Sequence, residues 1–489
     1  MTMEATDAKL ITRRQALAIG GVLFLITCLP LCSARDLPIT DLPGHITVAQ
    51  VWSEFDNPDY RYAEHFEVTA DLETTVMYYG FLRAASWVLP VRWANKLYIA
   101  CSFALLIVGL VVLLRVHGRP YEYAVGGFAL AWTYSLGSGF VSFASTTGLL
   151  LIGYGLLARL GDSDWWQRRW LVVANIAVAV GLYFTHVFAW LLWAPIALLH
   201  GRWRGLALVM IAALPVLGID ESGEAGKEKG KIAVLAIWYF EPKVAYNYLF
   251  DFVSSPWLIV LVLLLVSAYV ASVLLGQRES IFTDRRPLAL LLVLVCMYVA
   301  FPFGFRQPVY WTNVDVRLPA ILALVGLACL PCRFANHKRL LMACAPLLLI
   351  SILHPVLIAQ RFAEFDDQTE PFYELVDQIP HGAHASVLIK DTYISEGWRR
   401  ITPKLPSQTR ERGAWRHFPN YLTVERGGPM PNPMARMFPV ALRTDKQPRA
   451  APTYVLIRSR RPMSEHKGYN KLDERGKWSL WQRIGTSPR

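Results

Sequence analysis

Residues 14–34 read RQALAIGGVLFLITCLPLCSA, and a short polar run, Asp41-Leu42-Pro43-Gly44-His45, follows a few residues later. About 18 apolar residues are enough to cross the hydrocarbon core of a bilayer. Comparable apolar stretches recur along the chain, so we predict an all-α polytopic membrane bundle of about eleven transmembrane helices. The predicted spans are residues 14–34, 94–115, 122–137, 140–158, 170–185, 187–200, 204–218, 256–275, 287–302, 316–332 and 339–359.

The composition supports this class. Of 489 residues, 54% are hydrophobic and 18% are charged, against about 25% charged in soluble domains. The net charge of +12 does not indicate nucleic-acid binding, because Lys and Arg cluster at the ends of alternate spans, as membrane orientation requires. The seven cysteines lie within or beside apolar spans, so the spacing predicts neither a disulfide framework nor a metal site.

Charge also orients the chain. If Arg13 and Arg14 are cytoplasmic, every later loop on that side is short and basic, for example around Arg115, Arg159 and Arg286. This is the pattern that the positive-inside rule describes. We therefore predict a cytoplasmic N-terminus and an extracytoplasmic C-terminus.

This orientation divides the chain into two predicted domains. Residues 1–361 form the transmembrane domain, with a first outer loop at 35–93. Its segment 73–90 is amphipathic and is expected to lie at the interface or to form a lead-in helix. Residues 362–489 form a small extracytoplasmic α/β domain, with strands at 386–389, 454–457 and 478–481 and a short helix at 372–379.

Asp41 and His45 are the candidate catalytic residues. A carboxylate just outside the bilayer can act as a general base on a hydroxyl or bind a divalent cation. The alternative is a turn or a helix cap, because Asp-x-Pro-Gly favours turns. His45 comes one helical turn later if a helix begins at Pro43, so the two side chains could share a ligand, although a lone histidine is more often structural.

Three further residues are candidates for substrate binding. Arg317 follows Asp315 at the outer mouth of span 316–332, where a guanidinium can clamp a phosphate. A surface pair with Asp315 or a snorkelling anchor are the alternatives. Arg306 lies in the same outer loop and could share the role. His186 lies between two apolar helices, where it lines a cavity or makes a hydrogen bond within the turn.

In layout and in four short motifs, the chain resembles the GT-C superfamily of membrane glycosyltransferases, and in particular its little-characterised bacterial members. The motifs are Asp41-Leu42-Pro43-Gly44-His45, Gly139-Phe140-Val141-Ser142-Phe143, Thr185-His186-Val187-Phe188 and Asp315-Val316-Arg317-Leu318-Pro319. The resemblance implies a bacterial inner-membrane enzyme with its active site on the extracytoplasmic face. It also implies a polyprenyl-phosphate-linked sugar as donor and a lipid or glycan as acceptor.

The resemblance places Asp41 where the superfamily has a first-loop acidic residue, which serves as base or metal ligand. The superfamily motif often has two adjacent carboxylates, whereas Leu42 follows Asp41 here. A divalent cation (Mg²⁺ or Mn²⁺) is therefore an open expectation, with Asp41 as its ligand if one binds. A second carboxylate would come from Glu54, Asp56 or Glu241, and Glu241 is also a candidate substrate-binding residue.

Two other functions fit the composition. A transporter or flippase would carry charged residues at mid-membrane and paired repeats with broken helices. The charges here concentrate at helix ends, and the sequence contains no evident repeat. A non-catalytic membrane component of envelope polysaccharide assembly is the other alternative, and it would lack an outward cavity near Asp41.

Overall fold

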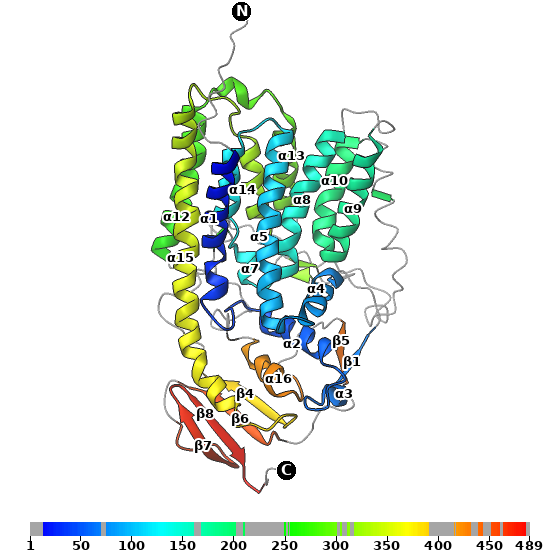
Figure 1. The fold of residues 1–489 in the computed structure, drawn as a ribbon, viewed down its shortest axis with the longest axis vertical. Coiled ribbons are helices and arrows are strands. Elements are labelled where there is room, and N and C mark those ends of the chain that lie inside the picture. The colour runs from blue at the N-terminus through cyan, green and yellow to red at the C-terminus, as the bar shows by residue number, and fades with distance from the viewer. Residues whose placement is uncertain are drawn as a thin grey trace, which may run out of the picture.

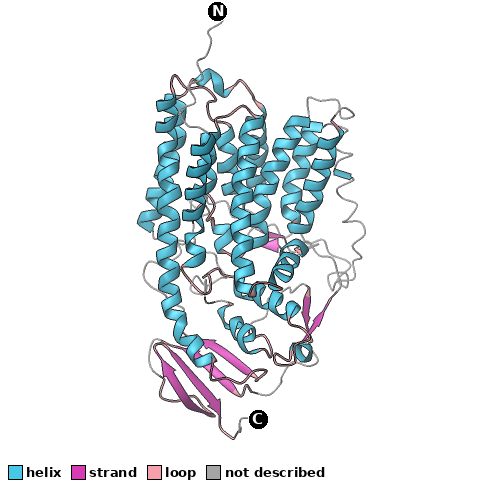
Figure 2. Ribbon diagram, in the orientation of Figure 1, coloured by secondary structure: helices cyan, strands magenta, loops and turns pink. Residues whose placement is uncertain are grey.

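Most of the chain is helical, and the long helices run side by side along the long axis of the molecule (Figures 1 and 2). The structure, a computed structural model, describes residues 13–69, 75–160, 168–201, 209–210, 249–250, 253, 255–300, 304–305, 311–312, 317–390, 415, 417–431, 439–443, 451–459 and 463–485.

The bundle follows the predicted spans closely. Its helices are α1 (Arg13–Cys32), α5 (Val91–Val116), α8 (Val141–Leu160), α9 (Arg169–Thr185), α10 (Val187–Gly201), α12 (Ser255–Leu275), α13 (Arg286–Ala300), α14 (Leu318–Ala328) and α15 (His337–Val376). Among the described residues, α1, α5, α8, α12 and α15 are long and apolar enough to cross a membrane, and the other four are shorter apolar helices.

The outward faces of these helices are apolar, as α12 illustrates. Leu261 and Ala268 are fully buried against the bundle. Leu263 and Leu274, on the other face, are 60% and 65% exposed. Contiguous apolar surface of this kind is unusual on a soluble monomer, whereas hydrocarbon accepts it readily. The pattern confirms a bundle whose natural surroundings are lipid.

The prediction of one continuous span at 122–137 is wrong. The structure has a 3₁₀ turn η1 (Tyr121–Ala124), then α6 (Val125–Ala129) and α7 (Tyr134–Gly137), separated by non-helical residues. In the break, the Trp132 indole N–H donates to the Thr27 carbonyl oxygen of α1 at 2.8 Å. This tertiary contact holds the chain out of the helix. The predicted span 204–218 lies almost wholly outside the described residues.

A four-stranded sheet lies at the end of the molecule near the C-terminus (Figure 1), in the order β4-β6-β8-β7. The strands are β4 (Ala385–Ile389), β6 (Tyr454–Arg458), β7 (Tyr469–Arg475) and β8 (Trp478–Arg483). β4 and β6 are parallel and the other pairs are antiparallel. The three predicted strands are confirmed, and they form part of a small C-terminal sheet domain. β7, a polar and largely exposed strand, was not predicted.

Helix α15 joins the bundle to the sheet. The predicted span 339–359 and most of the predicted helix 372–379 are parts of this one 40-residue helix, so the predicted domain boundary at residue 361 falls inside it. At its far end, the Trp478 indole N–H donates to the Gln368 carbonyl oxygen at 3.0 Å. The sheet domain is therefore carried directly on a helix of the bundle.

The first loop and the C-terminal region interlock beside this sheet. The first loop contains α2 (Leu42–Ser53), α3 (Tyr62–His65), β1 (Phe66–Val68) and α4 (Val76–Ser86), and the C-terminal region contributes η7 (Phe418–Asn420), α16 (Tyr421–Arg426) and β5 (Val440–Leu442). β1 pairs antiparallel with β5. Arg92 at the base of α5 pairs with Asp36 at 2.6 Å and with Glu425 of α16 at 2.5 Å.

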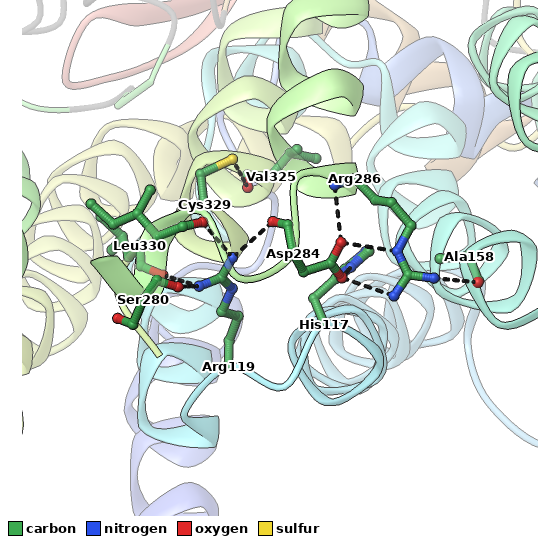
Figure 3. Close-up of polar contacts among 10 residues, drawn as sticks. His117, Arg119, Ala158, Ser280, Asp284, Arg286, Val325, Cys329 and Leu330 are labelled. Carbon is green, nitrogen blue, oxygen red and sulfur yellow. Dashed lines mark hydrogen bonds and ion pairs between the residues drawn. The ribbon is translucent and has the colours of Figure 1, made fainter. Parts of the chain in front are cut away.

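The opposite end of the bundle is closed by an ionic cluster (Figure 3). Buried Arg119 donates hydrogen bonds to the backbone carbonyls of Ser280, Ile281, Asp284 and Leu330. The Asp284 carboxylate accepts from Arg286 and pairs with His117. Partial burial raises the pKa of Asp284, but hydrogen bonds from Arg286 and His117 outweigh burial and hold that pKa well below its usual range.

This cluster connects the turn after α5 to the segments 276–285 and 329–336. Those segments hold the 3₁₀ turn η4 (Arg278–Ile281) and an isolated bridge between Gly276 and Phe334. The basic residues predicted to be cytoplasmic lie at this end of the helices, for example Arg115 and Arg159 at the ends of α5 and α8. A further two-stranded pair, β2 (Gly304–Phe305) with β3 (Trp311–Thr312), completes the described elements.

Candidate functional site

The four sequence motifs meet at one end of the bundle, around the turn between α7 and α8. Gly139 in this turn has φ +98°, a conformation that glycine adopts without strain. A Cβ at Gly139 would lie 2.6 Å from the Asp41 Cβ. The Thr40 N–H also donates to the Gly137 carbonyl oxygen at 3.0 Å. Glycine therefore allows the start of α2 to touch the turn directly.

Asp41 occupies the N-cap position of α2, but its side chain makes no capping hydrogen bond. Its Oδ1 atom lies 3.4 Å from Nε2 of His417, a residue from the C-terminal region. The Asp41 side chain keeps 28% exposure while that of His417 is almost buried. The Asp41 carboxylate therefore does not cap α2 through a side-chain hydrogen bond, which was the alternative interpretation of the sequence.

His45 lies one turn into α2, as predicted, and its ring supports the turn beneath Asp41. Its Nδ1 atom lies 2.6 Å from the Tyr79 hydroxyl of α4, and the ring also hydrogen-bonds to the backbone of Gly139. Burial lowers the pKa of His45 to about 4, although the nearby Asp41 carboxylate opposes this. At neutral pH the ring is uncharged and is held between Tyr79 and Gly139.

Arg317 lies immediately before α14 and is buried among aromatic rings. Its guanidinium lies 4.1 Å from the centre of the Phe140 ring, 5.4 Å from that of Phe143 and 5.7 Å from that of Phe188. Such rings attract a cation through their faces. Phe140 follows Gly139 in the chain, so the same turn carries both the Asp41 contact and the Arg317 contact.

The Arg317 guanidinium faces His186 in an unusual way. The Arg317 Nη1 atom lies 3.0 Å from Nε2 of His186, while the Phe188 backbone N–H donates to Nδ1 of His186 at 3.2 Å. A neutral imidazole has one acceptor nitrogen, and a guanidinium only donates. A neutral His186 ring therefore accepts from only one of these two donors, and its tautomer decides whether that donor is Arg317 or the Phe188 N–H.

An anion beside this pair would give the guanidinium a charged acceptor. A phosphate or carboxylate oxygen can accept from the Arg317 N–H groups, and charge-assisted hydrogen bonds of this kind are the strong ones. The surrounding phenylalanine rings provide an apolar wall, which strengthens the attraction between charges. The arrangement therefore has the chemistry of a site for an anionic group attached to an apolar chain.

The structure brings together Asp41, His45, Arg317 and His186 from three separate segments. Arg306, Asp315 and Glu241 lie outside the described residues. Glu54 is the C-cap of α2, about 20 Å along the helix from Asp41 by the rise of 1.5 Å per residue, so neither it nor the following Asp56 can share a metal ion with Asp41. Within the described ranges, no three His, Cys, Asp or Glu side chains are grouped to hold a metal.

Two residues at this site were missed by the sequence reasoning. Tyr79 lies in the amphipathic segment predicted at 73–90. The residue pattern of that segment predicted an interfacial or lead-in helix and gave no sign of a site residue. His417 lies 376 residues from Asp41 in a stretch with no recognisable motif. Only the docking of the C-terminal region onto α2 reveals it.

Comparison with known proteins defines the fold class. No family model matches the sequence, and no curated protein matches it. The chain shares its overall fold with a solved structure, that of ArnT from Cupriavidus metallidurans bound to undecaprenyl phosphate. The TM-score is 0.52, with 13% sequence identity over 97% of this chain and 99% of that chain.

Proposed function

We propose that the protein is a membrane glycosyltransferase that takes a sugar from a polyprenyl-phosphate donor and attaches it to a lipid or glycan acceptor. Two observations support this. The fold is GT-C-like, and the solved ArnT structure with that fold holds undecaprenyl phosphate. Independently, a carboxylate and a buried arginine–histidine pair lie on the two sides of one turn, Gly139-Phe140.

The donor phosphate would lie between Arg317 and His186, with Arg306 as a further expected contact. In the reaction, the bond from the anomeric carbon to the phosphate oxygen breaks, and negative charge grows on the leaving phosphate. Donors already aimed at that position stabilise the growing charge without having to reorganise. The polyprenyl chain would run along the apolar helix faces.

Asp41 would act on the acceptor. Its carboxylate would accept the proton of the acceptor hydroxyl while the acceptor oxygen bonds to the anomeric carbon. This single displacement inverts the anomeric centre. Glu241 is proposed as an additional substrate contact. Dependence on Mg²⁺ or Mn²⁺ is a further prediction, which transfer assays with and without a chelator would test.

The sidedness of the reaction follows from charge in this proposal. The basic helix ends gather opposite Asp41, so the positive-inside rule places the site and the sheet domain on the extracytoplasmic face of a bacterial inner membrane. About eleven spans then carry the chain from a cytoplasmic N-terminus to an extracytoplasmic C-terminus. Labelling of single cysteines introduced at exposed positions of the sheet domain in intact cells would test this topology.

The main support for the proposal is the position of Asp41. Its side chain is partly exposed, it does not cap α2, and one turn joins it to the Arg317–His186 pair. We expect Asp41→Asn to reduce transfer at least about 1000-fold. The assay uses protein in nanodiscs, a panel of radiolabelled undecaprenyl-phosphate-linked hexoses and pentoses, and bacterial envelope lipid extract as acceptor.

Asp56→Asn is the matched control, because it neutralises an exposed carboxylate of the same loop and should leave transfer within about twofold. Both variants should melt at the temperature of the parent protein. Full transfer by Asp41→Asn would remove Asp41 from the mechanism. Movement of the labelled lipid across proteoliposomes without release of undecaprenyl phosphate would indicate the flippase alternative, and neither activity would indicate the assembly component.

A further inference from the structure

The C-terminal region places a histidine directly on Asp41. His417 precedes η7 and is 5% exposed, and its Nε2 atom is the ion-pair partner of the Asp41 Oδ1 atom at 3.4 Å. The first loop and the C-terminal region are separated by the whole bundle in sequence. Their meeting at the candidate base is therefore a property of the tertiary structure alone.

Contacts that do not involve Asp41 hold this histidine in place. The Thr47 hydroxyl of α2 shares its proton between the Pro43 carbonyl oxygen at 2.8 Å and the Asn420 carbonyl oxygen at 3.1 Å. The Asn420 N–H donates to the His417 carbonyl oxygen at 2.9 Å. Tyr62 donates to the Thr423 carbonyl oxygen at 2.8 Å. The backbone that carries His417 is thus held against α2 and α3 by contacts that are independent of the Asp41 carboxylate.

The Asp41 side chain is partly buried and partly exposed. Oδ1 is buried and makes no hydrogen bond, and it lies 3.4 Å from Nε2 of His417. The side chain as a whole keeps 28% exposure, so part of it other than Oδ1 is open to solvent. His45, the other titratable neighbour, is turned toward Tyr79 and Gly139.

We propose that His417 is a positioning residue for the transfer reaction, which holds Oδ1 of Asp41 so that Oδ2 points to the acceptor hydroxyl. The inference rests on the proposed function. Oδ2 takes the acceptor proton, and the His417 N–H stabilises the carboxylate orientation through Oδ1 without exchanging a proton of its own. The active site is then assembled from both ends of the chain and is incomplete without the C-terminal region.

Kinetics of single and double variants test the role. We expect His417→Ala to lower kcat about 10- to 100-fold and to leave the KM for the undecaprenyl-phosphate-linked sugar within about twofold, because the donor site is elsewhere. His417→Gln, which retains an N–H donor, should recover part of the loss. In the Asp41→Asn background, His417→Ala should cause no further loss, because both changes remove one function.

Thr47→Val is the matched control. It removes a tether of the same segment to α2 and leaves His417 and Asp41 in place, so we expect transfer within about threefold of the parent. An equal loss in Thr47→Val and His417→Ala would show that docking of the segment matters and that the imidazole does not. Full activity of His417→Ala, or losses that multiply with Asp41→Asn, would also overturn the proposal.

Melting temperatures measured without substrate separate the glycosyltransferase proposal from the proposed positioning role of His417. Melting temperatures of the parent, Asp41→Ala, His417→Ala and the double variant form a thermodynamic cycle. We expect His417→Ala to lower the melting temperature of the parent and to cause no further change in Asp41→Ala. Coupling together with no transferase activity in the parent would overturn the glycosyltransferase proposal, whereas transfer without coupling would overturn the role of His417 alone.

Discussion

Arg119 and Arg317 lie at opposite ends of the bundle, and the protein surrounds the two buried guanidinium groups differently. Arg119 donates to four backbone carbonyls at 2.9 to 3.2 Å, beside the Asp284 cluster (Figure 3). Arg317 lies over three phenylalanine rings, and its Nη1 atom lies 3.0 Å from Nε2 of His186.

The difference indicates separate roles. A guanidinium whose donors point at fixed carbonyls contributes to stability, because removing it leaves those carbonyls without a partner. A guanidinium that contacts aromatic rings and an imidazole gains a strong partner when an anion arrives. We therefore interpret the basic end of the bundle as a structural closure and the opposite end as the binding site. Variants at each end should separate the two roles.

Of the two arginines, Arg317 is expected to have the larger effect on transfer. We expect Arg317→Ala to reduce transfer about 100- to 1000-fold, by loss of stabilisation of the leaving phosphate. Arg317→Lys should be intermediate, because an ammonium neither stacks on the rings nor binds phosphate in a bidentate manner. Undecaprenyl phosphate should raise the melting temperature of the parent protein and not that of Arg317→Ala.

Arg83→Ala is the control for this prediction. Arg83 is an exposed cation of α4 at the same end and lies over the Trp52 ring at 4.6 Å. Equal loss of lipid binding in both variants would mean that general positive charge, rather than the Arg317 site, attracts the phosphate.

At the basic end, Arg119→Ala should act on stability. We expect it to lower the free energy of unfolding by about 3 kcal/mol, since several buried carbonyls lose their donor. The activity per folded molecule should stay within about twofold. Melting curves in detergent and specific activity of the folded fraction measure the two quantities. Normal stability with lost activity would place function at the basic end and reverse the assignment.

The smallest expected effect is the pH dependence from His45. The folded pKa of about 4 lies below the unfolded value near 6.5. Between these values the unfolded chain binds a proton that the folded chain excludes, so stability falls as the pH drops from 6.5 toward 4. The loss is roughly 2 to 3 kcal/mol at pH 4.

His45→Gln should remove this part of the pH dependence. The measurement is the melting temperature of parent and variant at pH 7 and pH 4.5, and the difference between the two pH values should be smaller in the variant. An unchanged difference would mean that His45 titrates as in the unfolded chain and that its contact with Tyr79 does not hold the ring neutral.

The helices of the bundle were predictable from sequence wherever apolar composition alone is enough to locate a span. Spans such as α12 are apolar on every face, so their location requires no knowledge of neighbours. The break at 130–133 was not predictable, because Trp132 leaves the helix for a hydrogen bond with Thr27 of another helix. Strand β7 was missed for a related reason, since a polar exposed strand carries no apolar alternation and forms by pairing with β8.

At the site, the sequence by itself determined the types of residue and their depth. Asp41, His45, His186 and Arg317 stand at span ends, where polar groups in an apolar chain are costly unless they have partners. Only the tertiary structure decided which of them meet. The missing side chain at Gly139 lets Asp41 approach the turn that carries Phe140, and packing of the C-terminal region brings His417 onto Asp41. These contacts join segments that are far apart in sequence. They depend on how the segments pack together, and the local residue pattern does not encode that packing.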